Sequence, residues 1–253
     1  MKTTVILPTY NEIENIVYLV RAIDGAIEGE KEILVLDDNS PDGTSQAIQK
    51  LIDEREIPYL RLITRIHNRG LTNSIRDGIA HARGDTVVWM DCDFSMPPSV
   101  IPELLAEIDR GYDIAVGSRF VEGGSFKKDT TDSQDSWIAV VLSRGLNIFI
   151  RALLGGWFKD YTSGFIAVRK KVFEKVHFGG DYGEYFMEII LKAHLHNFKI
   201  IEIPYICLPR ARGESKTGTN MKQYIKRGIK YVRTALGLFW TRVKYSLFRV
   251  IDA

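Results

Sequence analysis

Residues 87–95, VVWMDCDFS, decide how this chain folds and where its chemistry lies. A hydrophobic run, predicted as a strand over residues 85–90, leads directly into Asp91 and Asp93. Residues i and i+2 point to the same side of a strand, so the two carboxylates can share one hard cation. The segment therefore predicts a Mg²⁺ or Mn²⁺ site at the carboxyl end of a buried strand. The pattern Asp-x-Asp is also common in ordinary loops, so the prediction depends on the rest of the chain.

Outward from this segment, predicted strands alternate with predicted helices. The other strands of the first half cover residues 3–7, 32–36, 60–64 and 113–117. The helices between them cover residues 13–27, a segment that ends near Glu54, residues 70–81 and residues 97–110. This alternation predicts an α/β domain whose mostly parallel sheet is covered by helices on both faces.

Polar residues follow four of these strands, and ligands of such sheets bind outside the carboxyl ends of the strands. The groups are residues 8–12, Asp37 with Asp38, residues 91–95, and Ser118 with Arg119. The adjacent carboxylates of Asp37 and Asp38 suit a nucleotide base or ribose, although the same residues suit an ordinary turn. Arg119 is a candidate anion clamp, although a lone arginine is more often salt-bridged or on the surface. Together the four groups predict one cleft.

Composition and missing motifs narrow the class of protein. The 253 residues are 45% hydrophobic, and we expect neither a signal peptide nor a transmembrane helix. Cys92 and Cys207 form no disulfide framework, which favours a reducing, cytoplasmic compartment. The chain lacks the glycine-rich signatures of dinucleotide oxidoreductases and P-loop NTPases. A nucleotide diphosphate held by metal and basic side chains remains.

The second half of the chain has a looser pattern. We expect a mobile loop over residues 122–136, helices over 137–158 and 185–196, and strands over 165–168 and 200–206. Positive charge gathers at the end. Residues 209–253 carry 11 Lys/Arg and 2 Asp/Glu, a net charge of +9, whereas the remainder carries 23 and 30, a net charge of −7. This asymmetry suits an anionic surface, either a membrane or nucleic acid.

Two features of the basic end have alternative interpretations. Residues 210–216, RARGESK, suit the binding of a phosphate group, or else form a solvated basic loop. A helix over residues 222–250 has an apolar face with a basic rim, which suits a membrane interface or packing on the domain. Residues 142–158 are a second interface candidate or part of the core. We therefore expect a domain over residues 1–220 and a basic amphipathic helix over 221–253.

Eight short stretches together resemble one protein family. They are LPTYNE (7–12), LDDNSPDGT (36–44), NRGLTNSIRDGIAHARGD (68–85), MDCDFSMPP (90–98), GSRF (117–120), LSRGLN (142–147), DYTSGF (160–165) and RARGESKTG (210–218). In this order over residues 3–220, the chain resembles the family-2 inverting glycosyltransferases. Within them it resembles most the polyprenyl-phosphate hexose synthases, the group of the dolichol-phosphate mannosyltransferases. Each stretch alone is weak, whereas the combination is specific.

The resemblance implies a GT-A fold, Mg²⁺ or Mn²⁺, a nucleotide-sugar donor and a polyprenyl or dolichyl phosphate acceptor. The expected reaction is inverting transfer of a hexose, with mannose from GDP-mannose as the expected sugar and donor. By motif, the nucleotide would be bound by Pro8, Tyr10, Glu12, Asp37, Asp38, Asp91 and Cys92, and the metal by Asp91, Asp93 and Ser95. Catalysis would fall to Asp93, Arg119, Arg210 and Lys216, and acceptor-phosphate binding to Arg119, Ser143 and Arg144.

The chain also departs from the family pattern. Ala139 stands where the family commonly has an arginine, so one acceptor-phosphate contact is missing or comes from elsewhere, for example from Arg144. Ser95 stands where some relatives have glutamine. We expect none of the C-terminal transmembrane helices that some relatives have. We therefore expect peripheral binding at the cytoplasmic face of a membrane, directly or through a small membrane-anchoring subunit.

Two other functions stay open. A family-2 transferase that uses a UDP-sugar of glucose or N-acetylglucosamine would act on a lipid phosphate or on a polysaccharide. A polysaccharide hydroxyl needs a carboxylate base, for which Glu184 and Glu188 are candidates. A non-catalytic protein that binds nucleic acid through its basic end is the other. The aspartate pair and the converging strand ends disfavour it, so we expect no nucleic-acid partner.

Overall fold

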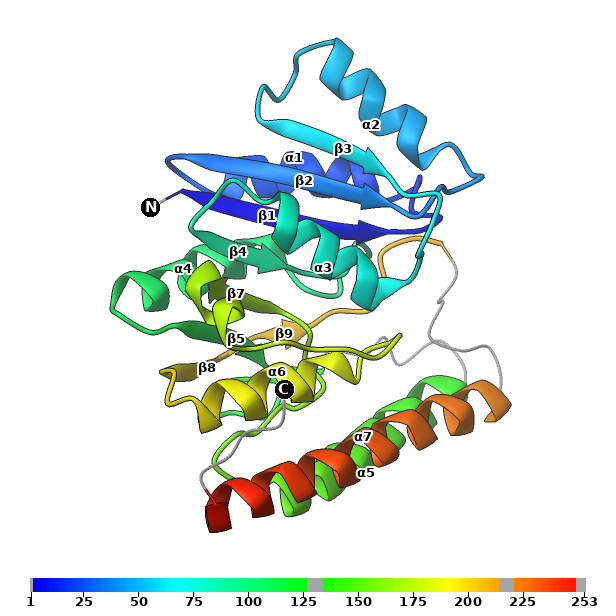
Figure 1. Cartoon of the computed structure of the whole chain (residues 1–253). Helices are drawn as coiled ribbons and strands as arrows, with labels where there is room; N and C mark the ends of the chain where they lie inside the picture. The colour runs from blue at the N-terminus through cyan, green and yellow to red at the C-terminus, as the bar shows by residue number, and fades with distance from the viewer. Residues whose placement is uncertain (1, 127–133, 214–220, 249–253) are drawn as a thin grey trace.

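A seven-stranded sheet forms the centre of the computed structural model, which describes residues 2–126, 134–213 and 221–248 (Figure 1). The strand order is β3-β2-β1-β4-β7-β5-β8, and β7 alone runs antiparallel to its neighbours. The strands are β1 (Thr3–Thr9), β2 (Lys31–Asp37), β3 (Leu60–Thr64), β4 (Thr86–Trp89), β5 (Ile114–Ser118), β7 (Ile166–Arg169) and β8 (Ile200–Pro204). The mostly parallel α/β sheet predicted from the sequence is confirmed.

Helices cover both faces of the sheet because its strands are hydrophobic on both sides. Val5 and Leu7 of β1 belong to one buried cluster with residues of α1, α2 and α4. Ile6, between them, belongs to a second cluster with residues of α3 and α6. These helices are α1 (Ile16–Ala26), α2 (Thr44–Asp53), α3 (Leu71–His81), α4 (Ile101–Asp109) and α6 (Tyr185–Leu195). The layers leave the carboxyl ends of the parallel strands open for a site.

Several predicted boundaries are wrong for local reasons. The helix expected over residues 137–158 is α5 (Gln134–Leu154), which ends before Gly155, because a φ of 113° at Gly155 cannot continue a right-handed helix. The strand expected over 200–206 divides after Pro204, and β9 (Ile206–Cys207) pairs instead with β6 (Ser125–Phe126). The loop expected over 122–136 thus contains a strand and the start of α5, and its residues 127–133 lie outside the described residues.

The aspartate pair lies beyond its strand rather than on it. Strand β4 ends at Trp89, and Cys92 and Asp93 form part of a turn. Strand alternation therefore does not set the directions of Asp91 and Asp93. The turn does so, with Phe94 held at a φ of 65°.

The helix α7 (Met221–Phe248) lies beside α5 at one side of the molecule and contacts α6 as well (Figure 1). Ala235 and Leu238 of α7 are buried in the same cluster as Ile6 and Trp89 of the sheet. The opposite side of α7 exposes large apolar side chains, at Ile229, Leu236, Trp240, Leu247 and Phe248. The predicted packing on the domain therefore holds for one side of α7, and the other side is an exposed apolar surface. Among the described residues, no helix combines the length and hydropathy that crossing a bilayer requires.

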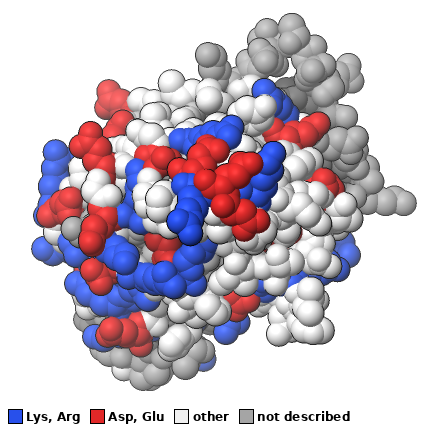
Figure 2. All heavy atoms as spheres, turned by 90° about the horizontal axis from the view of Figure 1, so that it is seen from above, with Lys and Arg blue, Asp and Glu red and all other residues white. Residues whose placement is uncertain are grey.

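Acidic and basic side chains are interspersed over the face that lies at the top of Figure 1, as Figure 2 shows. Ion pairs at this edge of the sheet include Arg61 with Glu32, which joins β3 to β2, and Arg21 with Glu56. Mutual neutralisation of this kind gives nucleic acid little to bind. This described face therefore lends no support to a nucleic-acid partner.

A close contact between α3 and the sheet gives a test of the packing. A Cβ added to Gly78 would lie 2.5 Å from Ile6 Cγ2 and 3.2 Å from Leu36 Cδ1. We expect Gly78→Ala to lower the free energy of unfolding by about 1–3 kcal/mol, measured by urea denaturation. Gly25→Ala in α1 is the control, because a Cβ there meets nothing within 4 Å. Equal effects of the two substitutions would contradict the packing.

Candidate active site

The predicted cleft is one large cavity at the carboxyl ends of β1, β2, β4 and β5. Its volume is about 1460 Å³. Most of the site residues predicted from the sequence line it, namely Pro8, Tyr10, Glu12, Asp38, Asp91, Cys92, Asp93, Ser95, Arg119, Ser143 and Arg210. Asp37 and Arg144 do not line it, and Lys216 and the side chain of Ala139 lie outside the described residues. The fold therefore brings both predicted ends of the reaction, donor and acceptor, into one space.

Two aspartates occupy the floor of this cavity. The backbone N–H of Ser95 donates to Asp93 Oδ1 at 2.9 Å and fixes that carboxylate. Asp91 lines the cavity. Desolvation by the surrounding protein, and then the nearby charge of Asp93, raise the pKa of Asp91 to about 7. A divalent cation would relieve this repulsion between two carboxylates. Among the described residues no three His, Cys, Asp or Glu side chains form a group that could hold a metal ion by itself, but Mg²⁺ commonly uses one or two carboxylates together with substrate phosphates. The donor set therefore fits such an ion.

Arg210 lies against the same carboxylates. Its Nη2 is 2.5 Å from Glu12 Oε2, and its Nη1 is 3.2 Å from Asp93 Oδ2. The backbone N–H of Ala211 donates to the carbonyl of Asp93 at 2.9 Å and holds the segment in place. Partial burial acts to lower the pKa of Arg210, but Glu12 and Asp93 raise it above its ordinary value. A permanent cation thus stands where an anionic diphosphate would meet the metal.

The two adjacent aspartates after β2 have different surroundings. Asp37 is fully buried, and its carboxylate accepts hydrogen bonds from the Ser40 N–H at 3.1 Å and the Ser45 hydroxyl at 2.5 Å. It therefore holds the turn and does not reach the cavity. Asp38 lines the cavity, pairs with the buried guanidinium of Arg65 and accepts the Gly70 N–H at 2.6 Å. Sequence reasoning missed Arg65.

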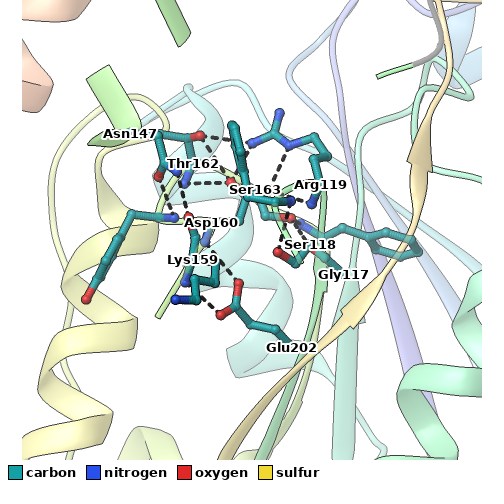
Figure 3. Close-up of polar contacts among 12 residues, drawn as sticks. Gly117, Ser118, Arg119, Asn147, Lys159, Asp160, Thr162, Ser163 and Glu202 are labelled. Carbon is teal, nitrogen blue, oxygen red and sulfur yellow. Dashed lines mark hydrogen bonds and ion pairs between the residues drawn. The ribbon is translucent and has the colours of Figure 1, made fainter. Parts of the chain in front are cut away.

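Arg119 is both salt-bridged and at the cavity (Figure 3). Its Nε and Nη2 donate to the two oxygens of Asp160 at 2.8 and 2.7 Å, and Nη2 also donates to Thr162 Oγ1 at 2.9 Å. Burial acts to lower the pKa of Arg119, but the charge of Asp160 raises it, so the group stays cationic. The centroid of the Phe126 ring lies 4.9 Å from the guanidinium carbon of Arg119 and 5.9 Å from that of Arg144. Asp160 was not among the site residues predicted from the sequence.

The helices α5 and α7 contribute apolar side chains to the lining of the cavity. Leu142, Leu146 and Phe149 line it from α5, and Tyr231 and Val232 line it from α7. A cavity of this kind suits a hydrocarbon chain.

The two candidate bases lie elsewhere. Glu184 accepts the Asp181 N–H at 3.2 Å, and Glu188 accepts the Gly179 N–H at 2.9 Å and pairs with Lys192 at 3.0 Å. Neither lines the cavity. A reaction that needs a carboxylate base near an acceptor hydroxyl therefore finds no support in these two residues.

Comparisons with known proteins agree with this geometry. The family profile described as Glycosyl transferase family 2 matches residues 4–177. A dolichol-phosphate mannosyltransferase of Pyrococcus furiosus is 38% identical, over 89% of this chain and 62% of that protein, so the chain spans less than two thirds of its length. A polyprenol monophosphomannose synthase of Mycolicibacterium smegmatis is 34% identical, over 88% of this chain and 83% of that protein.

Solved structures share the fold. Glucosyl-3-phosphoglycerate synthase from Mycobacterium tuberculosis, in complex with Mn²⁺, UDP and glucosyl-3-phosphoglycerate, superposes with a TM-score of 0.68 at 17% sequence identity. The match covers 94% of this chain and 79% of that one. The same enzyme has also been solved with Mg²⁺ and UDP. The GT-A fold expected from the sequence is confirmed.

Proposed function

The chain belongs to glycosyl transferase family 2, and from this membership we propose that it moves a hexose from a nucleotide-diphosphate sugar to a polyprenyl phosphate. Mannose is the proposed hexose and GDP-mannose the proposed donor, because two similar proteins are named for mannose and a polyprenol or dolichol phosphate. One observation carries the proposal. The cavity that is lined by the aspartates and arginines is also lined by apolar side chains of α5 and α7.

The donor end would be held by residues with opposite tasks. Asp38 and Glu12, which line the cavity, would accept hydrogen bonds from the nucleoside, and Asp91 and Asp93 would hold Mg²⁺ or Mn²⁺. When bound there, the cation supplies positive charge that stabilises a leaving diphosphate. Arg210 adds a fixed guanidinium, which exchanges its contacts with Glu12 and Asp93 for the diphosphate oxygens.

The acceptor end explains why no general base is needed. A phosphate monoester is already anionic at neutral pH, so its oxygen can attack the anomeric carbon directly. That bond forms as the bond from the anomeric carbon to the diphosphate oxygen breaks, and the electron pair leaves with the nucleoside diphosphate. One in-line displacement inverts the anomeric carbon. Arg119 and Ser143, which line the cavity, would hold the acceptor phosphate, and the apolar side chains of α5 and α7 would contact the isoprenoid.

A panel of acceptors and donors tests this proposal against its alternatives. The purified chain is incubated with Mg²⁺ or Mn²⁺ and radiolabelled GDP-mannose, UDP-glucose or UDP-N-acetylglucosamine. Each donor is offered a short polyprenyl phosphate, the matching polyprenol and a soluble oligosaccharide. We expect label to enter the organic phase only when polyprenyl phosphate is the acceptor. The donor that supplies this label should be GDP-mannose. Transfer to the oligosaccharide would favour the second function, and transfer from a UDP-sugar would correct the donor.

The outer side of α7 supports peripheral membrane binding. Ile229, Leu236, Trp240 and Leu247 recur at helical spacing and form one exposed stripe. Exposed basic residues lie close to that stripe on the helix surface, at Lys226, Arg233 and Lys244. Apolar side chains with flanking lysines and arginines suit the surface of an anionic bilayer. We therefore propose that α7, with the exposed residues of α5, attaches the chain to the cytoplasmic face of a membrane, directly or with a small anchoring subunit.

Substitutions in this stripe test the attachment. We expect the double variant Trp240→Ser, Leu247→Ser to bind anionic vesicles at least tenfold more weakly in a flotation assay, because each side chain contributes about 1.5 kcal/mol or more when buried. Ile66→Ser is the control, since Ile66 is 64% exposed but lies after β3, outside α5 and α7. Unchanged binding of the double variant would remove the stripe from the membrane contact.

A further inference from the structure

The Asp160 carboxylate has a single main partner, which is Arg119. It is fully buried, and three donors of Arg119 reach it, namely the backbone N–H at 3.0 Å, Nε at 2.8 Å and Nη2 at 2.7 Å. A bidentate pair of this kind fixes the plane of the guanidinium as well as its position. Thr162 accepts a further hydrogen bond from Nη2. The Nη1 edge of Arg119 is not used by Asp160 or Thr162.

The segment that carries Asp160 is itself held from two sides (Figure 3). Glu202 of β8 accepts the backbone N–H groups of Lys159 and Asp160 at 2.7 and 2.9 Å. Asn147 of α5 donates to the Lys159 carbonyl at 2.6 Å and accepts the Tyr161 N–H at 3.0 Å. Asn147 is buried and Glu202 is half-buried, and the burial of Glu202 raises its pKa. These four hydrogen bonds anchor the loop segment to β8 and α5.

Asn147 also joins this segment to the helix that lines the apolar part of the cavity. Ser143 and Asn147 are four residues apart on α5 and therefore lie on one side of it. Ser143 lines the cavity, whereas Asn147 holds the backbone beside Asp160. The guanidinium of Arg119 is thereby fixed relative to the helix that would contact an isoprenoid chain.

We propose that Asp160 is a positioning residue, which orients Arg119 so that its Nη1 edge meets the acceptor phosphate. Asn147 fixes the position of the Asp160 segment relative to α5. The proposal rests on the proposed function, in which Arg119 holds that phosphate. It gives a part to two sequence stretches, LSRGLN and DYTSGF, whose Asn147 and Asp160 were left without one. A buried ion pair that served stability alone would instead affect both substrates equally.

Kinetics of Asp160→Asn separate the two interpretations. Asparagine keeps the shape but loses the charge and one acceptor, so the guanidinium is no longer held by two parallel bonds. We expect kcat/KM for the polyprenyl phosphate to fall by roughly 10²-fold, as for a catalytic group displaced by about 1 Å, with KM for the donor unchanged. Asp113→Asn is the control, because Asp113 is also buried and ion-paired, with Lys171, but lies away from the cavity. An increase in the KM of the donor as large as that in the KM of the polyprenyl phosphate would overturn the proposal.

A double-mutant cycle tests whether Asp160 acts through Arg119. In an Arg119→Lys background, whose ammonium cannot form the bidentate pair, Asp160→Asn should lower kcat/KM by less than threefold more. Multiplication of the two single effects would overturn the proposal. If Asp160→Asn does not fold, Thr162→Val replaces it, because it removes the hydroxyl that bonds both Arg119 Nη2 and Asp160 Oδ1 and leaves the ion pair.

A spectroscopic measurement keeps this inference separate from the proposed function. In NMR spectra of arginine side chains, the Arg119 Nε–H should exchange slowly with water in the wild-type protein and rapidly in Asp160→Asn. An unchanged exchange rate would overturn the positioning role. If the wild-type protein makes no lipid-linked product, the proposed function fails, while the exchange rates still decide whether Asp160 positions Arg119.

Discussion

Asp93→Ala should abolish metal-dependent transfer and leave the fold intact. In the proposed site Asp93 would hold the divalent cation, and it also pairs with Arg210 at 3.2 Å. Its removal takes away a metal ligand and one anchor of that arginine together. A metal contributes several kcal/mol of charge stabilisation in such reactions, so we expect kcat to fall by roughly 10³-fold or more. Steady-state rates at saturating Mn²⁺ measure the loss, and binding of Mn²⁺ followed by electron paramagnetic resonance measures the affinity.

The control for this substitution is Asp109→Ala, at the exposed end of α4. It removes a carboxylate without touching the cavity, so both its rate and its Mn²⁺ affinity should match the wild type. Asp93 is only half-buried, so the melting temperature of Asp93→Ala should also stay close to the wild-type value. Retained metal-dependent transfer in Asp93→Ala would remove the metal assignment.

Arg210→Ala should produce the next largest loss. Its guanidinium contacts Glu12 and Asp93 and would neutralise the diphosphate as it leaves. Removing a single charge-stabilising donor typically costs 10²–10³-fold in kcat, and we expect about that loss here. Because Arg210 and the metal compete for Asp93, Mn²⁺ should bind Arg210→Ala at least as tightly as the wild type. The expected pattern is therefore a low kcat with undiminished metal binding.

Arg212→Ala is the matched control for Arg210. Arg212 lies two residues away on the same segment, is exposed, and stacks on Tyr18 at 4.5 Å outside the cavity. We expect its kcat to stay within about threefold of the wild-type value, as is usual for surface substitutions. Similar losses in the two variants would assign the effect to the general charge of the segment rather than to the contacts of Arg210.

The order of elements and the location of the cleft could be predicted from the sequence because both follow from local patterns. Hydrophobic runs alternate with helical periodicity, and the residues after each strand meet at one edge of a parallel sheet. This reasoning placed Asp38, Asp91 and Arg119 at one cavity. It could not tell Asp37 from Asp38, because that difference depends on which carboxylate the turn with Ser40 uses.

Contacts between residues that are far apart in the sequence could not be predicted from it. Arg65 with Asp38, and Asp160 with Arg119, join separate elements of the fold, and no periodicity marks such pairs. The same applies to β7, whose antiparallel place between β4 and β5 brings residues 160–165 beside Arg119. The face of α7 that packs on the domain could not be predicted from the sequence either. An amphipathic pattern gives two faces, but only the packing of Ala235 and Leu238 shows that one of them is already covered.

The structure of the transfer product tests the central claim most directly. The purified chain is incubated with Mg²⁺ or Mn²⁺, the active nucleotide sugar and a short polyprenyl phosphate, and the extracted product is analysed by ¹H and ³¹P NMR. The mechanism predicts a hexose joined through its anomeric carbon to the lipid phosphate oxygen, with the anomeric configuration opposite to that of the donor. A product with retained configuration, or a sugar attached to a hydroxyl group, would contradict direct attack by the acceptor phosphate.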